Sequence, residues 1–591
     1  MSTPRPRPRA RRLQRRIAAL GGLWLLFAAS HAAGQGGPIQ LFPNLGTETP
    51  PQPEAPSTLQ SEGEADAPRG FRVEGLAPPG IDTIGLAGPA EGGFDQSLWT
   101  GSDGELILTL LRRLPVATRN PPLRALARRL LMTGAPVQGL AEPGSLLGAR
   151  AERLLAMGDL EGASALLDRV PATNEDSQIA RLVVQAALLR GDPETACSRA
   201  ADIAPTSDAA FWAKVTIYCR LVDGDQEGAS LGLALLRDQG QTDDEAFFAL
   251  VEMIAAGQPA TVPLGPGGPS AIHVALYRLA DLPLPPQALV SASPELLAVA
   301  AREPSLVADD PLAVAERAFL VGALSADGLA EQYRAAAPDG GDVLRQIGTT
   351  WGPRTRALAY NALPERGTAE RGQVLDALWR AAQGDERFLI AELFGAPFAE
   401  LPVERGRLRL APSAARALLV AERPIPAARW YSLVSGEAAV DQQARDDLVS
   451  LTPLFALAGF GGSVAVPDFD SEAMDAWLAA TPDAQAKAGH LLALLEGIGV
   501  PVPETAWQRL IAGPGQGPVP APPAPLWRTL EHAAAERRLG ETVLLALHMF
   551  DGEPQAAHPE AVAAGLQALR AVGLNQEARA IAMATALQMG L

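Results

Sequence analysis

Lysine is almost missing from this chain of 591 residues, in which only Lys214 and Lys487 occur. Arginine therefore supplies nearly all of the positive charge. The 67 acidic residues outnumber the 49 lysines and arginines, and the formal net charge is −18 at pH 7. Binding to nucleic acid requires a basic face for the phosphates, so this balance argues against such a partner. It also disfavours binding of the folded body to an anionic membrane surface.

Sequence patterns of familiar active sites are missing as well. There is no H-E-x-x-H, no Cys/His spacing for zinc, no G-x-S-x-G and no phosphate-binding loop. The segment Asp468–Asp475 lacks the glycine and the closing glutamate of a calcium loop, and we interpret it as a helix start capped by Asp470 or Ser471. The sequence thus assigns no catalytic residue, cofactor or metal ligand, while pairs of carboxylates for hydrolysis stay open because acids are plentiful.

Aromatic residues make up only 5% of the chain, whereas 47% of it is hydrophobic. The hydrophobic content and the length suffice for a large buried core or for several domains. Alanine, leucine, arginine and glutamate are the dominant residue types, and they favour helix. We therefore expect an all-α protein.

The first 34 residues have the three parts of a secretory signal peptide. Seven arginines and no acid precede an apolar run, Ile17–Ala29, and small residues suited to cleavage follow it. The alternative is an uncleaved anchor. Thirteen residues of helix span roughly 20 Å, which is short of the ~30 Å hydrocarbon core of a bilayer. We expect cleavage and a periplasmic or secreted protein with no later membrane span.

The next two segments differ in what they can bury. Residues 35–69 are rich in Pro, Glu and Ser and carry almost no apolar side chains, which predicts a disordered linker. Residues 70–102 are rich in Gly and Pro but carry spaced apolar residues such as Phe94 and Trp99. We interpret 70–102 as an extended arm that packs on the body, with disorder as the competing interpretation.

A regular repeat follows the arm. "AMGDLEGA", "LRGDPETA" and "VDGDQEGA" recur with their first glycines 33 residues apart, and a fourth glycine continues the spacing. The glycine suits the end of one helix, the aspartate caps the next helix, and an alanine five residues on lets the two helices approach closely. The turn glycines are Gly158, Gly191, Gly224 and Gly257, and the packing alanines are Ala163, Ala196 and Ala229.

These glycine and alanine positions resemble the tetratricopeptide repeat (TPR) family. The resemblance implies a TPR-like α-α superhelix, a solenoid of stacked helical hairpins. The period of 33 differs from the usual 34, and the aromatic positions of the family match poorly. The repeat block and the C-terminal end also resemble a family of exported bacterial proteins of unknown function labelled "antifreeze glycopeptide polyprotein-related". That label implies no ice binding, because the Ala-Ala-Thr repeats of antifreeze glycopeptides are absent.

The helical patterns continue beyond the repeats without a strict period. A proline-rich stretch after Gly257 stops the fourth repeat, and a second linker precedes two glycines, Gly540 and Gly573, that are again 33 residues apart. The predicted divisions are TPR-like repeats at 103–262, a degenerate helical solenoid at 263–512, a Pro/Gly linker at 513–525 and C-terminal helical hairpins at 526–591.

The two cysteines, Cys197 and Cys219, suggest a disulfide, since an exported protein meets an oxidising compartment. They fall in successive helices that should be antiparallel neighbours. With a turn near Thr206, their axial offset is about four residues, or roughly 6 Å, which is close to the limit of ~7 Å between Cα atoms in disulfides. The alternative is two free buried thiols. No C-x-x-C is present to suggest a redox pair.

Two classes of function remain. The first is a noncatalytic periplasmic scaffold whose helical repeats hold a protein or peptide partner in the cell envelope. The acidic balance of the chain would suit a partner with basic patches. The second is an envelope enzyme that acts on a cell-wall glycan or peptide through a site within 300–512. We favour the scaffold, because 300–512 shows only helical patterns.

Overall fold

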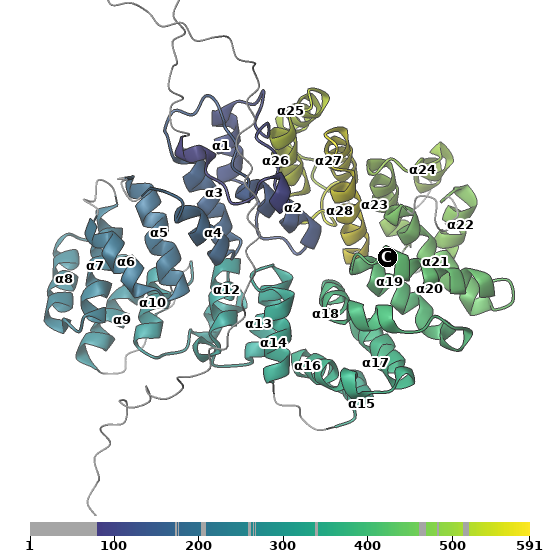
Figure 1. Cartoon of the computed structure of the whole chain (residues 1–591), viewed down its shortest axis with the longest axis horizontal. Helices are drawn as coiled ribbons and strands as arrows, with labels where there is room; N and C mark the ends of the chain where they lie inside the picture. Colours follow the sequence, from purple (N-terminus) through teal and green to yellow (C-terminus); the bar gives the residue numbers. More distant parts are fainter. Residues whose placement is uncertain are drawn as a thin grey trace, which may run out of the picture. The chain divides into compact units, whose positions relative to one another are not determined.

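The protein is all-α, as predicted. The structure, a computed structural model, describes residues 80–591 apart from 172–173, 175, 203–207, 258–261, 264, 266, 337–340, 460–468, 482–483 and 512–518. The described residues form 28 α-helices (Figure 1). Their only strand-like pairings are two isolated bridges, Ala87–Thr133 and Leu284–Val307. The predicted signal peptide, the linker 35–69 and the beginning of the arm lie outside the described residues.

The described part of the arm, from Gly80 onward, packs on the first helices. The carboxylate of Asp82 accepts hydrogen bonds from the backbone N–H groups of Gly144, Leu146 and Leu147 at 2.7–3.0 Å, so it caps the start of α3 from a distant part of the chain. Phe94, with 4% of its surface exposed, lies in the core. The first two helices are α1 (Gly104–Arg112) and α2 (Pro121–Met132).

Successive helices of the repeat region pack on one another in chain order. The four predicted turn glycines all have positive φ, between 63° and 79°, which a side chain would disfavour. The aspartate after each of the first three glycines caps the next helix, as Asp159 does by accepting from the N–H of Gly162 at 2.9 Å. The three predicted alanines are fully buried. The helices are α3 (Ser145–Ala156), α4 (Leu160–Leu167), α5 (Ser177–Arg190), α6 (Pro193–Asp202), α7 (Ala209–Val222), α8 (Gln226–Asp238) and α9 (Glu245–Ala256).

A disulfide joins Cys197 of α6 to Cys219 of α7, with 5.6 Å between the two Cα atoms. Both residues lie against the core. The pairing agrees with the sequence prediction, and a disulfide is consistent with an oxidising compartment.

Helices also fill the chain after Gly257, but many of them are short. Five of those between Gly257 and Ile511 start with proline at the first helical position, where the missing N–H costs nothing. Asp470 caps α22 by accepting from the N–H of Ala473 at 2.9 Å. These helices are α10 (Ala271–Leu279), α11 (Pro286–Val290), α12 (Pro294–Arg302), α13 (Pro311–Leu320), α14 (Ala326–Ala335), α15 (Val343–Thr349), α16 (Pro353–Ala362), α17 (Thr368–Ala381), α18 (Glu386–Glu400), α19 (Ala411–Val420), α20 (Pro424–Glu437), α21 (Gln442–Ala458), α22 (Ser471–Ala480), α23 (Ala484–Gly497) and α24 (Glu504–Ile511).

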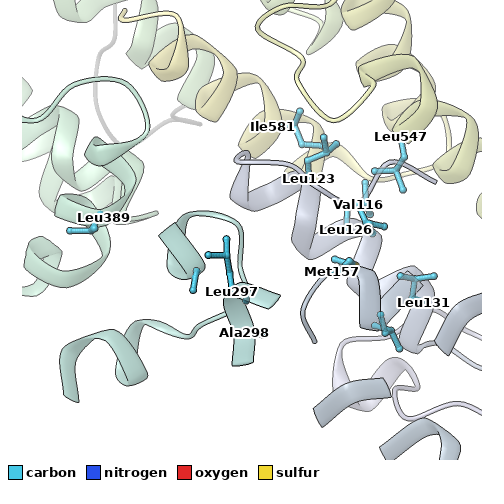
Figure 2. Close-up of a cluster of buried hydrophobic side chains, with 14 of the residues drawn as sticks. Val116, Leu123, Leu126, Leu131, Met157, Leu297, Ala298, Leu389, Leu547 and Ile581 are labelled. Carbon is cyan, nitrogen blue, oxygen red and sulfur yellow. The ribbon is translucent and has the colours of Figure 1, made fainter. Parts of the chain in front are cut away.

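The last helices pack against the first ones. Helices α26 (Leu539–Phe550) and α28 (Asn575–Gln588) both contact α2, and Figure 2 shows Leu123 of α2 beside Ile581 of α28. Arg129 of α2 forms an ion pair of 2.7 Å with Glu577 of α28. The remaining C-terminal helices are α25 (Ala524–Ala535) and α27 (Pro559–Ala571). Contacts between residues more than 400 positions apart thus join the first and last helices of the described part of the chain.

Among the residues that the structure describes, no helix combines the length and the apolar content needed to cross a membrane.

Candidate functional site

A hollow of about 900 Å³ lies along one face of α14, and we call it the α14 groove. Helix α14 lines it with Gly328, Glu331, Gln332 and Ala335, a spacing of three to four residues that places them on one side of a helix. The opposite walls come from α12, the start of α13 and α16. Four helices that are not all consecutive thus enclose one hollow.

Two smaller hollows adjoin the α14 groove. One, of about 340 Å³, is lined by α2 and by the α3–α4 turn, and it shares Arg302 and Ser325 with the groove. The other, of about 580 Å³, is lined by α15 and the start of α16, and it shares Arg354 with the groove. Because neighbouring hollows share lining residues, they lie next to one another, and we call the three together the groove system.

A buried ion network fixes the helices beneath the α14 groove. Arg356 of α16 donates two hydrogen bonds to Glu316 of α13, at 2.9 and 2.5 Å, and one to Glu386 at the start of α18, at 2.9 Å. The side chains of Arg356 and Glu316 are only 5% and 6% exposed. The hydroxyl of Tyr333 of α14 donates to Glu316. Burial and the charge of Glu316 hold the pKa of Tyr333 well above its ordinary value, so this hydroxyl stays protonated.

Arg124 connects the groove system to the N-terminal helices. From α2, it donates to the carbonyl oxygen of Leu320, at the end of α13, at 2.7 Å and to that of Thr118 at 3.0 Å. Burial lowers the pKa of Arg124 to about 10, which leaves the guanidinium charged at neutral pH. Gly322, with φ of 79°, passes so close to this side chain that a Cβ there would collide with it.

The groove system is richer in positive charge than the rest of this acidic chain. Arg345 and Arg354 are exposed, and neither has an ion-pair partner among the described residues. Arg302 is 37% exposed, and the nearest carboxylate oxygen, on Glu161, is 4.0 Å away. Five arginines line the three hollows (Arg124, Arg128, Arg302, Arg345 and Arg354) together with three carboxylates (Asp159, Asp310 and Glu331).

Two of those carboxylates already have structural roles. Asp159 pairs with Arg128 at 2.6 Å and caps α4. Asp310 caps α13 by accepting from the N–H of Ala313 at 3.4 Å. Of the three lining carboxylates, only Glu331 has no such role. The exposed guanidinium groups of Arg345 and Arg354 outnumber it, so they are available to an anionic ligand.

The residues that the sequence singled out lie mostly away from the groove system. Gly158 is the exception, because it lines the hollow next to α2 and a Cβ on it would meet the backbone of Pro294. The other turn glycines, the packing alanines and the disulfide build the repeat region. Sequence reasoning missed Arg302, Arg345 and Arg354, and no spacing marks them, since they come from three separate helices.

A second polar network has the residue types of a hydrolase triad. Ser270 Oγ lies 2.9 Å from His273 Nδ1, and His273 Nε2 lies 2.9 Å from Asp244 Oδ1. The backbone N–H of Ser270 also donates to Nδ1, at 3.0 Å, so this nitrogen closes the first turn of α10. The Asp244 carboxylate caps α9 and accepts from Lys214 Nζ at 2.7 Å.

The charge state of Asp244 agrees with a structural role for this network. Burial acts to raise the pKa of Asp244, but hydrogen bonds and charge from His273 and Lys214 outweigh it and hold that pKa below its ordinary value. The side chains of Lys214, Asp244 and His273 join α7, α9 and α10, and we interpret Asp244 and His273 as helix caps. No group of three or more His, Cys, Asp or Glu side chains in the described part of the chain is placed to hold a metal ion.

Comparison with models of known families, with curated proteins and with solved structures finds no match. The two resemblances noted in the sequence therefore remain predictions.

Proposed function

We propose that this protein is a noncatalytic, TPR-like helical scaffold of the cell envelope, which holds a segment of another protein in the groove system. The observation that carries the proposal is the set of three adjoining hollows, of which the α14 groove alone has about 900 Å³. Repeat proteins expose extended surfaces that suit elongated ligands.

The walls of the α14 groove support this function because they are fixed before a ligand arrives. The Glu316–Arg356–Glu386 network ties α13, α16 and α18 together, and Tyr333 adds α14. A preformed site costs less ordering entropy on binding than a flexible one. The signal-like N-terminus and the Cys197–Cys219 disulfide support a periplasmic or secreted location.

Filling the α14 groove tests the proposal. Ala335 is the last residue of α14, is exposed and lines the groove, so Ala335→Trp should obstruct it without disturbing the core. Ala535 is the matched control, since it is the exposed last residue of α25 and lines none of the three hollows. Wild-type protein and both variants would be purified from envelope extracts and the bound proteins quantified.

We expect one stoichiometric partner with the wild type and with Ala535→Trp, and its loss with Ala335→Trp. Equal recovery of that partner by all three proteins would show that the groove is not the binding site. Hydrolysis of cell-wall glycan or peptide by the purified protein would support the enzyme alternative instead.

A further inference from the structure

We infer that the groove system takes an extended peptide segment rich in Asp and Glu side chains. This inference rests on the proposed function and adds the chemistry of the partner. The net charge of the chain favours a partner with basic patches. The inference differs from that expectation, because the whole chain is acidic whereas arginines outnumber carboxylates in the lining of the three hollows.

The charge pattern is the first reason. Neither Arg345 nor Arg354 forms an ion pair with a described carboxylate. The guanidinium of Arg302 has one carboxylate within ion-pair distance, that of Glu161, at 4.0 Å. Guanidinium groups bind carboxylates through two parallel hydrogen bonds, which gives both affinity and orientation. A chain with 67 acidic residues has abundant carboxylates to pair these arginines internally, yet it leaves them available.

The dimensions are the second reason. The face of α14 between Ser325 and Ala335 is about 15 Å long at 1.5 Å per residue, which corresponds to four or five residues of extended chain. One adjoining hollow shares Arg302 and Ser325 with the groove, and the other shares Arg354 and adds Arg345. An extended segment that is longer than this face and also enters both adjoining hollows would contact all three arginines.

The lining of the α14 groove combines this charge with apolar surface. Leu312, Leu324 and Leu358 line it beside Arg302 and Arg354. A bound peptide would therefore place apolar side chains against the leucines and carboxylates against the arginines, as alternate residues of an extended chain permit.

The test uses a fluorescein-labelled ten-residue peptide of alternating Glu and Ala, with the Lys and Ala peptide of the same length as the comparison. Binding to the full chain would be followed by fluorescence anisotropy at low and at high salt. We expect the Glu peptide to bind, the Lys peptide not to bind, and the affinity to fall with salt.

Charge variants locate the binding. Arg345→Glu and Arg354→Glu should each weaken binding of the Glu peptide about three- to fivefold, and Glu331→Gln should strengthen it about twofold. Arg528→Glu is the control, because Arg528 is 84% exposed on α25 and lines none of the three hollows. All four side chains are exposed, so folding should be retained, which circular dichroism would verify.

Equal binding of both peptides, or no effect of Arg345→Glu and Arg354→Glu, would overturn the inference. Tighter binding of polygalacturonate than of the Glu peptide would assign the groove to an anionic glycan. If Ala335→Trp removes the envelope partner while the Glu peptide fails to bind, the docking function stands and only the acidic chemistry is wrong.

Discussion

Arg356 is the residue on which the candidate site depends most directly. Its guanidinium is buried and bonded to two carboxylates, one on α13 and one on α18. Removing one partner of a buried ion pair leaves an uncompensated charge away from water, which costs far more than the net contribution of the intact pair. Exposed ion pairs on the same protein should behave differently, because water solvates either partner when the other is lost.

The variant Glu316→Gln tests this difference. We expect it to lower the free energy of unfolding by about 3 kcal/mol, since Arg356 loses its bidentate acceptor and Tyr333 loses a charged one. Urea denaturation measures the change. The control is Glu370→Gln, whose partner Arg366 is 3.6 Å away and whose side chain is 62% exposed, with an expected change below about 1 kcal/mol. Equal effects of the two variants would contradict the role of the buried network.

At the scale of helices, the contact between α1 and α26 includes a titratable group. His548 Nε2 of α26 lies 2.9 Å from the carbonyl oxygen of Leu110 of α1. Burial lowers the pKa of His548 and outweighs the opposing effects of the Leu110 carbonyl and Asp551, and Arg113 adds a small lowering effect. The folded protein thus binds a proton at His548 less readily than the unfolded chain does.

The sign of the pH dependence follows from that lowered pKa. The stabilisation is fully present above the ordinary histidine pKa of about 6.5 and is lost as the pH falls below it toward the folded value. We expect hydrogen exchange in α1 and α26 to accelerate between pH 7 and pH 5, after correction for the intrinsic rate. His548→Gln should remove most of this dependence, whereas His532→Gln should not, because the His532 side chain is 64% exposed. An unchanged pH profile in His548→Gln would contradict the assignment.

The sequence predicts individual helices well where the signals are local. Gly158, Gly191, Gly224 and Gly257 mark helix ends because positive φ favours glycine. Pro453 lies inside α21 and does not end this helix, although proline lacks the N–H for a backbone hydrogen bond. Its neighbours Thr452 and Leu454 are buried, and their tertiary contacts outweigh that loss. Arg302, Arg345 and Arg354 could not be predicted as a group, because they lie on three different helices, α12, α15 and α16. Only the tertiary fold brings these helices together near α14, and the residue spacing within one helix carries no information about that.

At the scale of the whole described unit, residues 80–591, the contact of the last helices with the first is the feature that a repeat pattern could not predict. In an open stack each module contacts only its neighbours, so a defect in one module acts locally. Here α28 contacts α2, and Asn120, just before α2, bonds to Gln588 of α28 at 3.1 Å. Figure 2 shows further contacts of this kind, with Val116 and Leu126 near Leu547 of α26.

Ile581→Ala tests whether this contact couples the two ends of the chain. Ile581 is fully buried against Leu123, so we expect a loss of about 2–4 kcal/mol and a cavity between α28 and α2. Hydrogen exchange should then accelerate in α1 and α2 as well as in α27 and α28. Ile425→Ala is the control, since Ile425 is 70% exposed and its loss should change stability by less than about 0.5 kcal/mol. If protection falls only in α27 and α28, the two ends unfold independently. If it falls at both ends together, the closing contact holds α2, and with it the hollow beside Arg302, in place.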